Sequence, residues 1–265
     1  MDPIALLALF SPADFAAMGY TLVGAATLQH VIEKTDFRRP SVSAIMVHYR
    51  RDWMREFVTR QPRIFDATVL DGLRQGITFY ASTCLLALGG GMALLADTAP
   101  LQGLALSFDL HPDPALLMKA KILFVLAFVV SAFLKFVWSH RLFGYCSVLM
   151  ASVPNDASDP YAYERAARAA EVNITAARNY NRGLRSVYYA IGALGWLLGP
   201  WAFLATMTFT FSTLIRREFA SQSRIAIVAR LAEGDRSQRA APGPALAQPG
   251  GQRQTGGDQQ PGPGR

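Results

Sequence analysis

Residues 186–215 read SVYYAIGALGWLLGPWAFLATMTFTFSTLI and contain no Asp, Glu, Lys or Arg. A helix needs roughly 20 mostly apolar residues to cross a hydrocarbon core of about 30 Å, and a second charge-free run, ILFVLAFVVSAFL, occupies residues 122–134. A buried helix of a soluble protein explains one short run of this kind but not a run of thirty residues. The whole chain is 51% apolar and 17% charged, whereas soluble domains carry about 25% charged residues. These features predict an integral membrane protein.

The apolar pattern predicts an all-α fold in which residues 1–232 form a polytopic bundle of transmembrane helices. The expected spans are residues 4–30, 75–96, 116–138, 184–198 and 201–216. An amphipathic helix at residues 41–60 and a further helix at residues 160–183 are expected on the cytoplasmic side. Residues 233–265 are rich in Pro, Gly and Gln, so we expect a disordered tail there.

The beginning of the first span has two interpretations. In one, Ser11 is the N-cap of a helix, Pro12 occupies its first position, and Asp14 reaches back to the cap. In the other, a single span begins at residue 4 and carries the Asp14 carboxylate near its outer end, where a charge is costly. We favour the capping interpretation.

The helix at residues 41–60 has an apolar stripe with aromatic members and positive charge on its other side. The stripe recurs at three- and four-residue spacing and consists of Val42, Ile45, Met46, Tyr49, Trp53 and Phe57. Such a helix either lies in the membrane interface or packs its stripe on the protein's own bundle. Both alternatives remain open at this point.

Positive charge in the connections predicts the orientation of the chain, because Lys and Arg are enriched in cytoplasmic loops. The connections before the second span and after the third are rich in Arg, whereas residues 97–118 contain neither Lys nor Arg. The N-terminus is therefore expected outside, and the basic connections are expected in the cytoplasm. The tail is expected inside as well, because four arginines follow the last apolar run: Arg216, Arg217, Arg224 and Arg230.

A cytoplasmic tail requires residues 184–198 and 201–216 to be two short antiparallel spans that turn at Gly199-Pro200. Trp196 and Trp201 would then flank the turn at the outer interface, where tryptophan is enriched. The alternative is one helix kinked at Pro200, which gives four spans instead of five. We favour five spans in the inner (cytoplasmic) membrane, with Cys84 and Cys146 as packing residues of the bundle.

Several short motifs occur in an order that is typical of one family. They are Tyr49-Arg50-Arg51-Asp52-Trp53-Met54, residues 71–83, Lys121 and Lys135, Phe136-Val137-Trp138-Ser139, Tyr145-Cys146-Ser147, Asn181-Arg182-Gly183-Leu184-Arg185, Tyr188-Tyr189, Gly199-Pro200-Trp201 and Arg216-Arg217-Glu218-Phe219. Over residues 4–224 the chain resembles the domain-of-unknown-function 599 family of bacterial and plant membrane proteins. The resemblance implies a multi-span membrane protein and brings no assigned activity. The chain departs from the family pattern at residues 11–14 and at Lys119.

Ionisable residues inside a membrane are candidates for function. Lys121 and Lys135 lie fourteen residues apart on the third span, which places them on one helix face near opposite membrane boundaries. One interpretation is a cation-lined path or an anion-recognition site. The other is that both lysines extend to the two interfaces, with Lys121 paired to Asp14 or Asp113.

A second group of candidates belongs to the cytoplasmic boundary. Arg182 and Arg185 lie where the helix at residues 160–183 enters the membrane, and they could hold a phosphate or a lipid headgroup, or act only as an anchor. Asp66, Asp71 and Arg74 precede the second span, and we expect them to pair with these arginines.

The sequence predicts no catalytic residue, cofactor or metal site, because the four histidines lack ligand spacing and no phosphate-binding loop or nucleophile motif is present. The net charge of +7 is attributed to orientation and to anionic lipid headgroups as partners, not to nucleic acid. Self-association into a homo-oligomer is left open. Two functions follow as hypotheses: a bundle that binds or transports a small anionic solute or lipid, or a non-catalytic membrane scaffold with a basic cytoplasmic face.

Overall fold

A computed structural model describes residues 10–34, 40–107, 114–222 and 224–228, and this part of the chain is helical without any strand. In chain order its helices are α2 (Pro12–Glu33), α3 (Val42–Phe57), α4 (Ile64–Ala96), α5 (Ala99–Ser107), α6 (Ala115–Ala151), α7 (Ala162–Ala193), the short 3-10 helix η1 (Leu194–Leu198) and α8 (Pro200–Phe219). The chain divides into two compact units, residues 1–227 and 228–265, and these helices belong to the first. The predicted disordered tail at residues 233–265 lies outside the described residues. The all-α prediction is confirmed.

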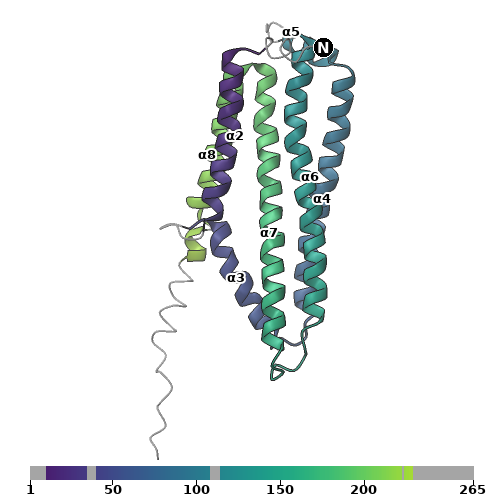
Figure 1. Cartoon of the computed structure of the whole chain (residues 1–265), viewed down its shortest axis with the longest axis vertical. Coiled ribbons are helices and arrows are strands. Elements are labelled where there is room, and N and C mark those ends of the chain that lie inside the picture. Colours follow the sequence, from purple (N-terminus) through teal and green to yellow (C-terminus); the bar gives the residue numbers. More distant parts are fainter. Residues whose placement is uncertain (1–9, 35–39, 108–113, 223, 229–265) are drawn as a thin grey trace, which may run out of the picture. The chain divides into compact units, whose positions relative to one another are not determined.

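Helix α7 occupies the centre of the bundle, with α6 on one side and α2 and α8 on the other (Figure 1). Helix α4 packs on α6, and α3 runs obliquely along α7. Three helices, α2, α4 and α6, are long and apolar enough to cross a membrane. Helix α6 has 37 residues, or about 55 Å at 1.5 Å per residue, so it is longer than a hydrocarbon core of about 30 Å.

The N-terminal cap of α2 is present as predicted. The Ser11 hydroxyl accepts a hydrogen bond from the Asp14 backbone, the Asp14 carboxylate accepts one from the Ser11 backbone, and Pro12 stands in the first turn. This reciprocal arrangement satisfies two backbone N–H groups that a helix start leaves open. Residues 4–9 of the predicted first span lie outside the described residues, and α2 continues past the predicted end to Glu33.

The apolar stripe of α3 packs on the bundle itself. Ile45 and Phe57 are buried, and the side chain of Trp53 donates a hydrogen bond to Asp66 at the start of α4. The hydroxyl of Tyr49 donates to the backbone oxygen of Ile227. Of the two alternatives for this stripe, these contacts support packing on the protein.

Helices α7 and α8 form an antiparallel hairpin through η1, and the turn lies at Gly199, whose φ of +112° suits glycine. Small residues let the two helices approach closely: the Thr206 hydroxyl donates to the Gly192 carbonyl at 2.7 Å. The hairpin was predicted, but α7 is one continuous helix where residues 160–183 and a separate span at residues 184–198 were expected. The prediction that Trp196 flanks the turn at an interface is wrong, because Trp196 is buried and stacks on Phe203, whereas Trp201 is exposed.

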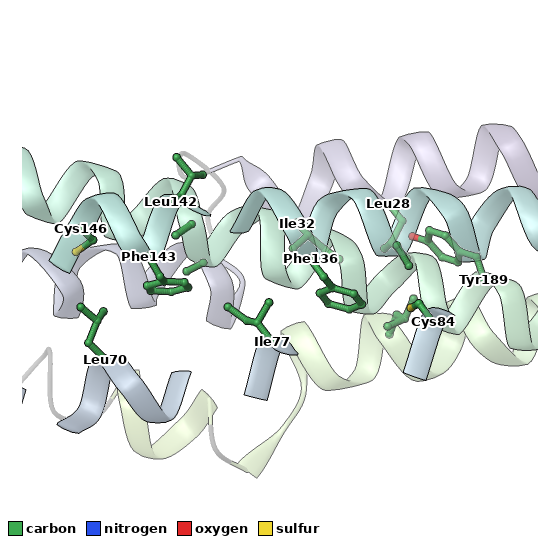
Figure 2. Packing of buried hydrophobic residues seen from close by; sticks show 14 of the residues in the cluster. Leu28, Ile32, Leu70, Ile77, Cys84, Phe136, Leu142, Phe143, Cys146 and Tyr189 are labelled. Carbon is green, nitrogen blue, oxygen red and sulfur yellow. The ribbon is translucent and has the colours of Figure 1, made fainter. Parts of the chain in front are cut away.

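The core follows the contact between α4, α6 and α7. Leu70, Ile77 and Cys84 recur every seven residues on α4, and Phe136 and Phe143 of α6 lie across from them (Figure 2). Cys84 and Cys146 are free and buried, so their prediction as packing residues is confirmed. The bundle is therefore built on one central pair of helices, α6 and α7, with the other helices packed around it.

Candidate functional site

Charged side chains gather at the level where α2 and α8 end, about halfway along α6, and α3 and the first half of α7 continue beyond this level (Figure 1). Glu33, the last residue of α2, accepts hydrogen bonds from Arg182 Nε at 2.8 Å and from Arg185 Nη2 at 2.7 Å. A second Arg182 nitrogen bonds the other Glu33 oxygen, so this pair is bidentate. The ion pairs join the C-terminal end of α2 to the middle of α7. We call this region, where α2 and α8 end, the arginine-rich end.

Lys135 of α6 lies beside this network. Its ammonium donates to the hydroxyls of Ser131 at 2.9 Å and Ser186 at 2.7 Å. It is also close enough to Arg182 and Arg185 to be repelled by them and to Glu33 to be attracted by it. The structure thus brings Lys135, Arg182 and Arg185 together, as three of the residues singled out in the sequence.

A polar cavity of about 280 Å³ opens between α2, α3, α7 and α8 next to these ion pairs. Its charged lining consists of Arg50, Arg178 and Arg185 and of the carboxylates Glu33 and Glu218. We call it the arginine cavity. Glu218 is engaged with α3, because it accepts hydrogen bonds from the Ser43 backbone at 3.2 Å and the Ser43 hydroxyl at 2.9 Å, which places a negative charge at the start of a helix.

Two arginines of this cavity have unused hydrogen-bonding capacity. Arg50 donates to the side-chain oxygen of Asn173, and no carboxylate among the described residues forms an ion pair with it. Burial lowers the pKa of Arg50, because an environment poor in water disfavours the charged form. Arg185 is 5% exposed, and its buried Nε has no hydrogen-bond partner within the described part of the chain.

The expected pairing of Asp66, Asp71 and Arg74 with the α7 arginines does not occur. Asp66 is fully buried and accepts hydrogen bonds from Trp53 Nε1 at 2.6 Å and from Arg60. Asp71 is exposed and accepts a hydrogen bond from Gln75 at 2.9 Å. Arg74 is half-buried and lines a different cavity together with Asp71. The reason is that α4 packs on α6 with these residues beside the last turns of α6, whereas Arg182 and Arg185 lie beside Lys135 in the middle of α6.

Asp14 and Lys121 meet at the opposite end of the bundle. Asp14 is 5% exposed and accepts a hydrogen bond from Trp196 Nε1 at 2.6 Å. Lys121 is 2% exposed, attracts Asp14 electrostatically, and has its ammonium 5.8 Å from the centroid of the Trp196 ring. Lys121 is therefore buried among partners and does not extend to an interface, while Asp113 lies outside the described residues. Lys121 and Lys135 have separate partners, Lys121 near the start of α6 and Lys135 in the middle of that helix.

Sequence reasoning missed several residues of the arginine cavity. They are the lining residues Glu33, Arg50 and Glu218, together with Asn173, the hydrogen-bond partner of Arg50. Glu33 had a signal, because it is the first acidic residue after the apolar run of the first span. Arg50 and Asn173 had none, because only the packing of α3 on α7 brings them together.

A third cavity, of about 540 Å³, lies in the apolar part of the bundle between α4, α6 and α7, with Gly90, Gly91 and Val129 among its lining residues. It carries no charged side chain. Among the residues that the structure describes, no group of three His, Cys, Asp or Glu side chains is placed to hold a metal ion. The charged chemistry of this protein therefore lies mainly at the arginine-rich end.

A family model described as "Protein of unknown function, DUF599" matches residues 16–223 of the chain. Neither the curated proteins nor the solved structures contain a match. The matched region runs from the first turns of α2 to just beyond α8 and so includes the arginine cavity, whereas Asp14 lies two residues before it. On this match, which spans most of its length, the chain belongs to the DUF599 family of proteins of unknown function.

Proposed function

We propose that this protein is a membrane-embedded helix bundle that binds a small anionic ligand, a free solute or a lipid headgroup, in the arginine cavity. The observation that carries the proposal is the pair of incompletely used arginines in that cavity, Arg50 and Arg185. A guanidinium group offers donors in a planar fork that fits a phosphate or a carboxylate. An anion in the cavity would supply the acceptors that these arginines lack.

The charges around the cavity favour an anion over a cation. Five cationic side chains surround it or lie next to it: Arg50, Arg178, Arg182, Arg185 and Lys135. Two carboxylates, Glu33 and Glu218, oppose them. Because a buried charge is stable only when it is paired or hydrogen-bonded, the excess positive charge is best matched by a bound anion.

The proposed membrane topology places this cavity on the cytoplasmic side. The chain would cross the inner membrane five times, by α2, α4, α6, the second half of α7 with η1, and α8. The N-terminus would then lie outside, and the arginine-rich end would lie on the cytoplasmic side of the membrane. The hairpin at Gly199 supports the return of α8 to the arginine-rich end, where Arg216 and Arg217 stand in its last turn. The ligand would then come from the cytoplasm or from the inner leaflet. Transport would need a second opening, so binding is the minimal proposal.

The proposal is tested by measuring how the purified full-length chain binds inorganic phosphate and vesicles that contain or lack an anionic phospholipid. We expect Arg185→Gln to weaken anion binding roughly tenfold, the size of one charge-assisted hydrogen bond. Glu33→Gln should strengthen binding, because it removes a competing carboxylate from Arg182 and Arg185. The control is Arg216→Gln, an exposed arginine at the same end that does not line the cavity.

The two cavity variants move binding in opposite directions, so a general loss of folding cannot produce both results. Unchanged affinity in Arg185→Gln and Glu33→Gln would overturn the proposal. Binding of vesicles without binding of free phosphate would identify a lipid headgroup as the ligand, and the reverse would identify a solute.

A scaffold function is the second candidate, and α4 is the feature that favours it. Hardly any of the apolar span of α4 is buried within the bundle, and a side chain at Gly90 within that span would meet nothing within 4 Å. Helices in membranes associate through exposed small residues of this kind. A monomeric mass for the chain in lipid nanodiscs would count against self-association by α4.

A further inference from the structure

A second charged cavity, of about 420 Å³, lies between the first turns of α4 and the last turns of α6. We call it the α4–α6 cavity. It shares no lining residue with the arginine cavity. Its charged lining consists of Arg63, Asp71 and Arg74, and its apolar lining includes Phe57, Leu70 and Met150.

Arg63 is held rigidly at one edge of this cavity. Its terminal nitrogens donate to the backbone oxygens of Val153 at 2.7 Å, Pro154 at 2.6 Å and Val58 at 3.1 Å. Its guanidinium carbon lies 4.5 Å from the centroid of the Phe57 ring. Backbone carbonyls are neutral overall, so Arg63 keeps its net positive charge, and its buried Nε has no partner in the described part of the chain.

Arg74 is available for an external partner. Its guanidinium makes no hydrogen bond or ion pair with any residue that the structure describes, and its Nε is buried. Asp71 is exposed, and its carboxylate accepts a hydrogen bond from the Gln75 amide. Two arginines thus oppose one carboxylate, and two buried guanidinium N–H groups in one cavity are left without protein acceptors, which is costly for charged donors.

We propose that the α4–α6 cavity binds a water-soluble organic anion that carries an apolar part. The phosphate or carboxylate of the ligand would accept hydrogen bonds from Arg74 and Arg63. Its apolar part would pack on Phe57, Leu70 and Met150, in a cavity whose size lies within the usual range of about 300–1,000 Å³ for small-molecule sites.

The position of the cavity favours a soluble ligand over a membrane lipid. Helix α4 carries no charge between Gln75 and its end at Ala96, so Arg74 is the last charged residue before the apolar span. The rest of the cavity lies beyond Arg74, on the first turns of α4 and on the connection after α6 that contains Asn155. That part of the bundle faces water in the proposed topology.

Phenyl phosphate is a suitable probe, because it combines an anion with a flat apolar group, and saturation-transfer NMR on the full-length chain in a neutral detergent measures its binding. We expect phenyl phosphate to bind more tightly than inorganic phosphate or benzyl alcohol. Arg74→Gln should weaken its binding roughly tenfold without loss of folding, because Arg74 makes no bond within the described structure. Asp71→Asn should strengthen binding. All affinities are compared in the Arg185→Gln background, in which anion binding in the arginine cavity is weakened. The matched control is Arg216→Gln, which lines neither cavity and should not change the affinity for phenyl phosphate.

Three results would overturn this proposal: equal affinities of Arg74→Gln and the unchanged chain, inorganic phosphate binding as tightly as phenyl phosphate, or binding of anionic vesicles alone. Because Arg185 belongs to the other cavity, an effect of Arg74→Gln that persists in the Arg185→Gln background separates the two sites. A loss of phenyl phosphate binding in Arg185→Gln but not in Arg74→Gln would assign the probe to the arginine cavity and contradict the inference.

Discussion

The two carboxylate oxygens of Asp14 hold two parts of the bundle together. One oxygen accepts hydrogen bonds from the Ser11 backbone at 2.9 Å and the Ser11 hydroxyl at 2.7 Å. The other accepts a hydrogen bond from Trp196 at the turn of the α7–α8 hairpin. Lys121 adds opposite charge nearby. A buried carboxylate is costly without such partners. Asp14 therefore stabilises the fold only when all of these partners are bound at once.

Asp14→Asn is therefore expected to destabilise the protein by about 1–3 kcal/mol, the usual cost of leaving buried polar groups unsatisfied. The amide cannot accept from all three donors and carries no charge opposite Lys121. Ser11→Ala removes only the cap hydroxyl and keeps both the Trp196 hydrogen bond and the charge opposite Lys121, so its effect should be smaller. Thermal unfolding followed by circular dichroism in detergent measures both. An Asp14→Asn protein that is as stable as Ser11→Ala would show that the Trp196 hydrogen bond and the charge contribute little.

At the scale of single elements, signals confined to a few neighbouring residues predicted the structure well. The cap at Ser11 and the turn at Gly199 are local, because one side chain or one backbone angle decides each of them. The expected boundary near residue 183 is absent because charge indicates the surrounding medium and not where a helix ends. The Ala-rich sequence of α7 favours a helix on both sides of that boundary.

Close approach of α7 and α8 leads to a prediction at the element scale. A Cβ atom at Gly192 would lie 2.6 Å from Met207 Sδ and 2.7 Å from Thr210 Oγ1. Gly192→Ala should therefore destabilise the hairpin by about 1–3 kcal/mol through overpacking. The matched control is Gly89→Ala on α4, where a Cβ meets nothing within 4 Å and helix propensity should add up to about 1 kcal/mol. Thermal unfolding of the two variants compares them directly, and a Gly192→Ala protein as stable as Gly89→Ala would contradict the close packing.

On the scale of the whole molecule, sequence gives neither the level at which charged side chains meet along the bundle nor their direction around it. Asp71 and Arg74 lie beside the last turns of α6, whereas Arg182 and Arg185 lie beside Lys135 in the middle of α6. The expected pairing is absent, and Arg182 binds Glu33, 149 residues away in the chain. Which charged side chains meet depends on the order of helices around α7, and no local pattern encodes that order. For the same reason the arginine cavity could be predicted only as a set of basic residues, without its acidic members.

The five-span topology predicts which side of the membrane each connection faces, and labelling of introduced cysteines measures this. The native thiols of Cys84 and Cys146 are buried, so they should react little with the label. Single cysteines are introduced at three exposed positions as Ala99→Cys, Ser158→Cys and Gln222→Cys. A membrane-impermeant maleimide should label Ala99→Cys in intact spheroplasts of a bacterial host. The other two should react only after the membranes are opened, because α6, the α7–η1 segment and α8 each carry the chain across once. Labelling of Gln222→Cys but not Ser158→Cys in intact spheroplasts would mean that α8 does not return, and labelling of all three from one side would contradict a spanning bundle.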